Sequence, residues 1–296
     1  MRNMTPPHTP AFPSAEFHPE DVDRLIAAAL DEDLTYGPDI TSRATVSADH
    51  RSSARIVARR PGTIAGLFVV DRVLRQVATS EFKVEEVAPD GTRVGPGDVV
   101  ARIEAGTRDL LTAERTLLNL LTHLSGIATA TAAWVDAVEG TGAAIRDSRK
   151  TLPGMRLLQK YAVTVGGGVN HRLGLGDRAL IKDNHVVAAG GVRAAFRAVR
   201  AAYPDKWCEV EVDTLDQLNE LLPEQPDEIM LDNFEPWAVQ VAVQRRNATA
   251  PGVLLEASGG LSLDVAADYA STGVDYLAVG SLTHSAPALD LGLDFD

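Results

Sequence analysis

The sequence predicts an α/β protein in which a small α+β domain with an open sheet is followed by a (β/α) barrel of parallel strands. Three observations support this fold class. Short β runs separated by turn signals occupy residues 40–105. Apolar strand-like runs alternate with helical stretches from residue 143 onwards. Most of these later runs end in a charged or small polar group.

The N-terminal part begins with a proline-rich segment. Residues 1–16 lack apolar periodicity, so we expect a flexible leader. A helix is predicted to begin near Pro19, because HPEDVDRLIAAALDEDL has one apolar face and acids in its first turn. The β runs of the small domain are SSARIVAR, GTIAGLF, FKVEEVA and DVVARIEA, and one helix, VVDRVLRQVA, interrupts them.

A strongly helical stretch over residues 109–139 links the two halves, and Ser125 and Gly126 are predicted to break it. The barrel strands are then expected at residues 143–150, 168–173, 179–185, 208–213, 228–233, 253–260 and 274–281. Helical stretches such as VRAAFRAVRAAY, TLDQLNELL and EPWAVQVAVQRR separate most of them. This spacing indicates a parallel sheet.

Chemically distinct side chains stand at the strand ends: Arg149 and Lys150, His171 and Arg172, Lys182, Glu211 and Asp213, Asp232, Ser258 to Gly260, and Gly280 with Ser281. In a barrel all these ends share one rim, where such folds carry their chemistry. In an open doubly wound sheet, the alternative, only the ends near the switch point converge. The complementary chemistry of the ends favours the barrel.

Composition excludes several classes of function. A formal net charge of −13 argues against general nucleic-acid binding. No apolar run is long enough to span a membrane and the N-terminus has no secretory signal, so we expect a cytoplasmic protein. Cys208 is the only cysteine, which excludes an intramolecular disulfide and predicts a small buried apolar side chain.

Positive charge is concentrated in residues 146–185, which hold eight Lys or Arg against three acids. A solvated basic face would explain such a run. Arginine binds carboxylate or phosphate bidentately and lysine acts as a point charge, so a rim holding both favours anionic ligands over a neutral substrate.

Glycine-rich turns are the candidate phosphate sites. The triplet at residues 166–168 matches no phosphate-loop pattern and is typical of a flexible turn. Ser258 to Gly260 precede a helix and Gly280 with Ser281 end the next strand, where barrels of this class bind phosphate. Glu211 and Asp232 form a carboxylate pair suited to Mg²⁺. The other interpretations are turn geometry for the glycines and a lysine partner, or outward-facing surface charge, for the acids of CEVEVD.

Several motifs in this order and spacing resemble the quinolinate phosphoribosyltransferase family: LLTAERTLLNLLTHLSGIAT, SRKTLPGMRLLQKYAV, GGGVNHRLGLGDRALIKDNH, CEVEVD, IMLDNF, LEASGG and GVDYLAVGSLTHS. The resemblance runs from about Asp31 to the C-terminus. It implies an N-terminal open α+β sandwich domain over residues 17–116 and an incomplete (β/α) barrel over 117–285, with the tail at 286–296 packed back on the first domain. One difference is Ser148, where the family pattern has threonine; a hydroxyl is kept.

The resemblance also implies roles for individual residues. Quinolinate carboxylates would contact Arg149, His171, Arg172 and Lys182, with Arg115 supplied by a partner subunit. Lys150, Glu211 and Asp232 would handle the pyrophosphate and ribose of phosphoribosyl pyrophosphate with Mg²⁺, the cofactor, bound by Glu211 and Asp232 directly or through water. The 5′-phosphate would bind at Ser258, Gly259, Gly260, Gly280, Ser281 and Leu282, and Ser148 and His284 complete the substrate-binding set. Lys150, Lys182, Glu211 and Asp232 form the catalytic set.

The implied reaction transfers phosphoribosyl to quinolinate with loss of CO₂ in NAD biosynthesis, in a homodimer or a hexamer built from dimers, with no nucleic-acid or membrane partner. Three alternatives remain open at this point: another pyridine such as nicotinate, a Schiff-base aldolase using Lys182, and a non-catalytic sensor of a phosphate ligand.

Overall fold

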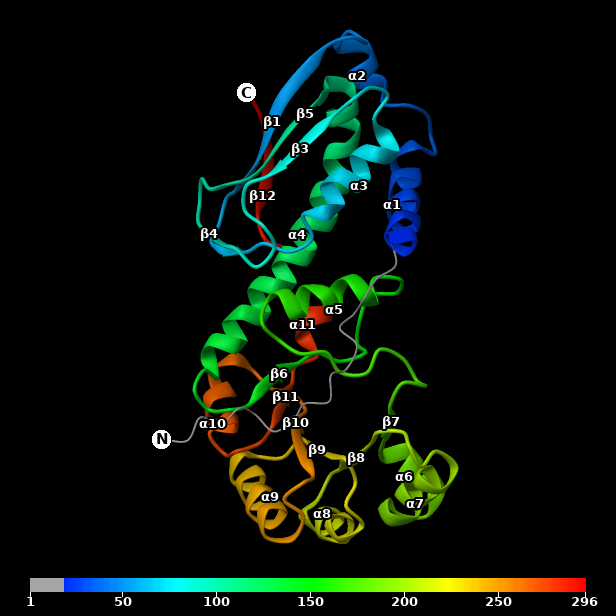
Figure 1. Cartoon of the computed structure of the whole chain (residues 1–296), viewed down its shortest axis with the longest axis vertical. Helices are drawn as coiled ribbons and strands as arrows, with labels where there is room; N and C mark the ends of the chain where they lie inside the picture. The colour runs from blue at the N-terminus through cyan, green and yellow to red at the C-terminus, as the bar shows by residue number, and fades with distance from the viewer. Residues whose placement is uncertain (1–18) are drawn as a thin grey trace. The chain divides into compact units, whose positions relative to one another are not determined.

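The computed structural model describes residues 19–296 (Figure 1), so the predicted leader at 1–16 lies outside the described residues. These residues form two compact units. Unit 1 comprises 133–151 and 168–282, and unit 2 comprises 19–132, 152–167 and 283–296. Every helix in the described part is too short or too polar to cross a membrane.

Unit 2 contains an antiparallel sheet with strand order β12-β1-β5-β3, formed by β1 (Arg51–Ala58), β3 (Lys83–Glu86), β5 (Val99–Gly106) and β12 (Leu291–Phe295). The C-terminal strand β12 pairs with β1, with Ile56 opposite Leu293. A two-stranded sheet joins β2 (Gly62–Thr63) to β4 (Arg93–Val94). The helices are α1 (Pro19–Leu34), α2 (Ile40–Thr45), α3 (Phe68–Val77) and α5 (Arg156–Val165). The short β2 contrasts with the longer run expected at GTIAGLF.

The long helix α4 (Thr107–Ala137) is continuous, so the predicted break at Ser125 and Gly126 is wrong. A Cβ atom at Gly126 would collide with the backbone of Pro287. Glycine therefore serves a close approach between chain segments here, and the helix tolerates it because packing outweighs its low helix propensity. The helix also runs through residue 116, where the boundary between the domains was expected. Residues up to 132 belong to unit 2.

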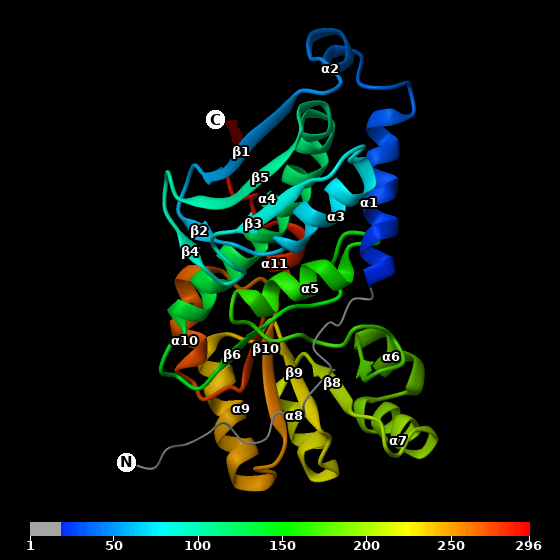
Figure 2. The same ribbon diagram turned by 45° about the horizontal axis from the view of Figure 1, so that its top comes forward.

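Unit 1 is built on a six-stranded parallel sheet with strand order β6-β11-β10-β9-β8-β7, whose strands are labelled in Figure 1. Figure 2 shows four of them, β6, β10, β9 and β8, from a second direction. The strands are β6 (Ala144–Arg146), β7 (Ala179–Ile181), β8 (Cys208–Val212), β9 (Glu228–Asp232), β10 (Leu254–Ser258) and β11 (Tyr276–Ala278). Helices α6 (Asp183–Ala189), α7 (Val192–Ala202), α8 (Leu215–Leu221), α9 (Pro236–Thr249), α10 (Ala266–Ala270) and α11 (Ser281–His284) follow the strands, with short 3₁₀ turns at Leu222–Glu224 and Leu263–Val265. The sheet does not close, as expected for an incomplete barrel.

The strand predicted at 168–173 is reduced to one parallel bridge between Arg146 and Val169. The strand predicted at 179–185 ends at Ile181, because α6 begins at Asp183. Lys182 adopts extended backbone at the start of this helix, and its N–H donates to Nδ1 of His185 at 2.9 Å. Residues 170–173 and 182–185 were predicted as strand residues, but they make no strand pairing with the sheet.

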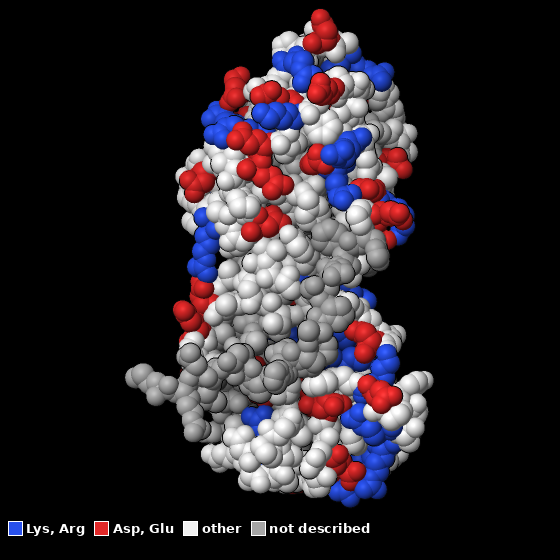
Figure 3. All heavy atoms as spheres, in the orientation of Figure 1, with Lys and Arg blue, Asp and Glu red and all other residues white. Residues whose placement is uncertain are grey.

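Charged side chains lie within unit 1, where barrels usually place branched apolar residues. Arg146, Glu209, Glu228 and Glu256 are each at most 1% exposed, and Arg178 is 2% exposed. Buried charges persist only when they are paired, and the pairs are described below. By contrast, the surface around α6 and α7 carries both signs of charge interspersed (Figure 3).

Candidate active site

The ends of the central strands bring three carboxylates together. Carboxylate oxygens of Glu211, Asp213 and Asp232 all lie within 4.8 Å of one another. Glu211 is buried and Asp213 is exposed, so the acids of CEVEVD run along one inward-facing side of β8 towards the rim. The outward-facing alternative is thereby excluded. Lys182 Nζ lies 3.1 Å from Glu211 Oε2, which places a cation from the end of β7 beside the carboxylates.

The candidate phosphate loop after β10 adjoins this carboxylate group. Ser258 is paired with Asp232 in register, and the N–H of Asn233 donates to the Ser258 carbonyl at 2.9 Å. Gly259 has φ +98°, and a Cβ atom there would lie 2.7 Å from the backbone nitrogen of Asn233. Only glycine fits this approach.

The second candidate phosphate segment joins β11 to α11: Gly280 precedes the helix, and Ser281 and Leu282 are its first two residues. Its strand β11 pairs with β10, so both turns follow neighbouring strands, as predicted. Leu282 is buried and Ser281 is exposed. Two adjacent turns rich in backbone N–H groups suit a phosphate.

Three of the predicted cations follow β6 and the bridge at Val169. Lys150 is exposed, and its N–H donates to Ser148 Oγ at 3.1 Å. Arg149 is half-buried, and Arg172 is 8% exposed. Burial, followed by the charge of Arg149, lowers the pKa of the Arg172 guanidinium. Crowded cations of this kind are stabilised by an anion of more than one charge.

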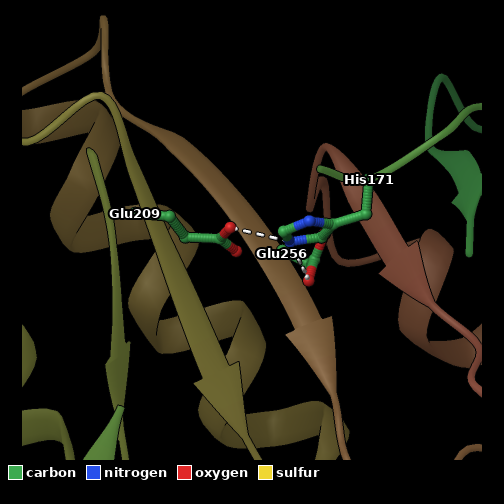
Figure 4. A group of neighbouring side chains, drawn as sticks. All are labelled: His171, Glu209 and Glu256. Atoms are coloured by element: carbon green, nitrogen blue, oxygen red, sulfur yellow. Dashed lines mark ion pairs between the residues drawn. The ribbon is translucent and has the colours of Figure 1, made fainter. Parts of the chain in front are cut away.

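His171 points into the interior of unit 1 instead of towards solvent (Figure 4). Its Nε2 lies 2.8 Å from Glu209 Oε2 and 3.8 Å from Glu256 Oε1. Its Nδ1 accepts the backbone N–H of Arg172 at 2.6 Å. Burial lowers the pKa of His171 to about 4, so the ring is neutral near pH 7.

Below the rim lies a buried ionic network, defined by Arg146, Arg178, Glu209, Glu228 and Glu256. Arg146 Nη1 donates to Glu228 and to Glu256 Oε2, the latter at 2.6 Å, and its guanidinium stacks 3.4 Å from the ring centroid of Tyr276. Arg178 Nη1 donates to Glu228 Oε2 at 3.1 Å.

The carboxyls of this network differ in pKa. Burial and then the charge of Glu228 raise the pKa of Glu209 to about 8. Burial alone would raise the pKa of Glu228, but Arg146 and Arg178 outweigh it and lower that pKa. Glu228 is therefore the carboxylate on which both guanidinium groups depend.

Two predicted site residues belong to unit 2. Arg115 is exposed on α4, and His284 is exposed at the end of α11 with its Nδ1 2.6 Å from Ser285 Oγ.

The glycine triplet at residues 166–168 has a packing role: a Cβ atom at Gly166 would collide with the backbone of α4 at Ala128. It is a packed turn at the end of α5 and not a phosphate loop, in agreement with the turn interpretation.

Several residues of the site were missed by the sequence analysis. Asp147, which is fully buried, accepts the N–H of His171 at 2.8 Å and the Asn170 side-chain amide at 2.7 Å. Glu209 and Glu256, which face His171, were also given no role. Asp213, in contrast, was named at its strand end and joins the carboxylate group. The signal available for Glu209 was the period of two in CEVEVD, which places it on the same face as Glu211.

Comparison with known proteins places most of the described chain in one family. Family models match the C-terminal domain of quinolinate phosphoribosyl transferase over residues 127–294 and its N-terminal domain over 39–125. A nicotinate-nucleotide pyrophosphorylase [carboxylating] of Mycobacterium leprae is 62% identical over 270 residues, covering 91% of this chain and 95% of that protein. Its human counterpart is 38% identical over 272 residues, covering 91% and 90%.

Solved structures agree. The nicotinate-nucleotide pyrophosphorylase from Francisella tularensis matches with a TM-score of 0.88 at 34% identity, covering 96% of this chain and 99% of that one. NadC from Streptococcus pyogenes matches with a TM-score of 0.88 at 37% identity, covering 95% and 99%. With both domain models matched and these relatives covered almost end to end, the chain belongs to the quinolinate phosphoribosyltransferase family.

Proposed function

We propose that the strand ends of unit 1 form the active site of a decarboxylating phosphoribosyltransferase. The enzyme transfers phosphoribosyl from phosphoribosyl pyrophosphate to quinolinate and yields nicotinate mononucleotide, pyrophosphate and CO₂ in NAD biosynthesis. The observation that carries this proposal is the rim itself. Four neighbouring strands, β7 to β10, end in turn with Lys182, with Glu211 and Asp213, with Asp232 and with Ser258. A cation, a carboxylate cluster and a candidate phosphate site therefore lie on one edge of the sheet.

The charges of the two substrates match this rim. Phosphoribosyl pyrophosphate carries roughly five negative charges near neutral pH and quinolinate carries two, since each phosphomonoester contributes about −1.5 to −2. Arg149 and Arg172, whose positive charges crowd each other, are the proposed partners of the quinolinate carboxylates, together with Lys182. Lys150 is the proposed partner of the pyrophosphate.

The carboxylate group fits Mg²⁺. Three carboxylates within 4.8 Å of one another offer the hard oxygen ligands that this ion prefers, and a rim position leaves room for the waters and substrate oxygens it retains. Glu211 and Asp232 are the proposed ligands, and we propose Asp213 as a third because its carboxylate lies beside theirs. When bound, Mg²⁺ neutralises charge on the departing pyrophosphate.

The protein's own contribution is orientation and electrostatics. The Ser258 and Gly280 turns hold the 5′-phosphate, and the cations hold the pyridine ring so that its nitrogen attacks C1′ opposite the leaving pyrophosphate, with inversion. C1′ gains oxocarbenium character as the bond to pyrophosphate breaks. The product is a pyridinium, whose positive nitrogen accepts the electron pair left when the 2-carboxylate departs as CO₂.

The reaction is tested by mixing the purified protein with Mg²⁺, quinolinate and phosphoribosyl pyrophosphate and measuring nicotinate mononucleotide and CO₂. Lys182→Ala should lower turnover at least about a hundredfold, whereas Lys206→Ala, an exposed lysine ahead of β8, should not change it. Turnover of nicotinate without CO₂ would instead identify another pyridine as the substrate. A borohydride-trapped adduct at Lys182 would support an aldolase, and ligand binding without turnover would support a sensor.

The exposed position of Arg115 on α4 suits a residue that completes the site of a partner subunit. In such a homodimer, mixing inactive Arg115→Ala and Lys182→Ala proteins recovers activity, because one of the mixed sites is intact. No recovery despite confirmed subunit exchange would contradict the shared site. Cytoplasmic location likewise follows as a proposal, which cell fractionation tests.

A further inference from the structure

The segment that carries Arg172 has little backbone support of its own. Within the described residues its backbone pairs with the sheet at one bridge, between Val169 and Arg146, so residues 170–172 have no strand ladder to fix them. Side chains do this instead. Asp147 holds the segment from one side, through the His171 N–H at 2.8 Å and the Asn170 amide at 2.7 Å.

His171 holds the segment from the other side. Its Nδ1 accepts the N–H of Arg172 at 2.6 Å, so the proton of the neutral ring resides on Nε2. That nitrogen faces Glu209 Oε2 at 2.8 Å, as the dashed line in Figure 4 shows. Nδ1 is therefore hydrogen-bonded within the protein, and Nε2 makes a close contact with a buried carboxylate without a hydrogen bond to it.

We propose that Glu209 and His171 are positioning residues that set Arg172 for the quinolinate carboxylate, an inference that rests on the proposed function. Glu209 is fully buried on β8 and fixes the imidazole, and the imidazole fixes the backbone of Arg172. The Arg172 side chain is held in turn through Nη1 to the carbonyl of Arg178 at 3.3 Å. His171 thus acts through Arg172, whereas the family resemblance implies direct contact with quinolinate.

The same three side chains, His171, Glu209 and Glu256, have the ligand types of a metal site. Two observations favour positioning instead. The first is that Arg146 already donates to Glu256 at 2.6 Å, so one of the three candidate ligands has a partner. The second is the charge of the network. The network contains three carboxylates against two guanidinium groups, so one proton brings it to neutrality and a divalent ion would leave it positive.

Steady-state kinetics on the full chain tests the proposal. Glu209→Leu removes the carboxylate that contacts His171 Nε2 and leaves two carboxylates facing two guanidinium groups, so we expect it to fold. A misplacement of about 1 Å costs up to about a hundredfold in a positioned group. We therefore expect the KM for quinolinate to rise at least about tenfold, with the KM for phosphoribosyl pyrophosphate changed less than about threefold.

Two variants control for a purely structural effect. Glu209→Gln keeps an acceptor oxygen and should restore the quinolinate KM to within about threefold of wild type. Glu228→Gln changes a carboxyl that is equally buried and is paired with Glu209 in register, but contacts Arg146 and Arg178 instead of His171. If Glu209→Leu raises both KM values equally, or if Glu228→Gln reproduces its selective effect, the positioning role is refuted.

A measurement on the protein without substrates separates this inference from the proposed function. Imidazole ¹⁵N spectra, with His171 assigned by the loss of its signals in His171→Gln, should show a neutral ring protonated at Nε2 in wild type. Glu209→Leu should alter that signal. A ring protonated at Nδ1, or a divalent ion that co-purifies only when Glu209 is present, would overturn the proposal even if turnover is normal. Absent turnover with the expected spectra would refute only the proposed function.

Discussion

Glu228→Gln should destabilise unit 1 strongly, because one carboxylate neutralises two buried arginines. Glu228 is fully buried, and its oxygens accept from Arg146 and from Arg178, the latter at 3.1 Å. The indole N–H of Trp207 donates to the same carboxylate at 3.1 Å. Glutamine keeps the size and one acceptor oxygen but removes the charge, leaving Glu209 and Glu256 as the remaining acids of the network.

The magnitude follows from the burial of both partners. Removing one member of a buried ion pair costs about 3–5 kcal/mol of folding free energy. Glutamine retains one acceptor oxygen, so we expect Glu228→Gln to cost about 3 kcal/mol. In a domain of this size class each kcal/mol lowers Tm by roughly 3 °C, so a fall of about 10 °C is expected. Glu209→Gln should cost less than about 1 kcal/mol, because burial already raises the pKa of Glu209 to about 8 and disfavours its charge.

Tryptophan fluorescence is the assay suited to this comparison. The three tryptophans, Trp134, Trp207 and Trp237, all belong to unit 1. Thermal unfolding followed by tryptophan fluorescence therefore reports the unfolding of that unit. Calorimetry on the same samples gives the enthalpy. Equal falls in Tm for the two variants, or a change below about 1 kcal/mol in Glu228→Gln, would show that the arginines do not depend on Glu228.

Three further predictions follow from other parts of unit 1. Cys208 is fully buried and its pKa is raised to about 12, chiefly by burial, so a thiol reagent should label it only when the unit unfolds. Gly259→Ala should raise the KM for phosphoribosyl pyrophosphate and destabilise by more than about 1 kcal/mol, because φ is +98° and the new Cβ would press on Asn233; normal kinetics would contradict the phosphate role. The pKa of His171 is about 4 in the folded protein and near 6.5 in the unfolded chain. Protonation of the unfolded chain therefore lowers the free energy of unfolding as the pH falls from 6.5 to 4. In urea titrations across this range, His171→Gln should show a smaller fall in that free energy than wild type.

The sequence predicted the rim because strand ends carry a strong local signal. Lys182, Glu211 and Asp232 each stand at or just after the end of an apolar run, and the parallel order of the strands brings them together without further information. The period of two in CEVEVD predicted that Glu211 and Asp213 share a face, and the carboxylate oxygens of both lie within 4.8 Å of those of Asp232, as this prediction requires.

What the sequence could not supply were long-range contacts. Gly126 has the signature of a helix break, but the segment that packs against it is Pro287, more than 150 residues away by their positions in the chain. The direction of the His171 ring depends in the same way on Glu209 and Glu256, which lie on two later strands. Local pattern gives no access to such partners, because each depends on the assembled sheet.

The buried network also bears on how the rim tolerates so much like charge. Arg149 and Arg172 repel each other, and an empty pocket of cations is unfavourable without an anion. Beneath them, the carboxylates of Glu209, Glu228 and Glu256 outnumber the two buried arginines. Because burial raises the pKa of Glu209 to about 8, one proton held by the network near neutral pH cancels this excess. The network therefore supports the cationic rim through the pairing of its guanidinium groups and not through surplus negative charge, and Glu228→Gln would break that pairing.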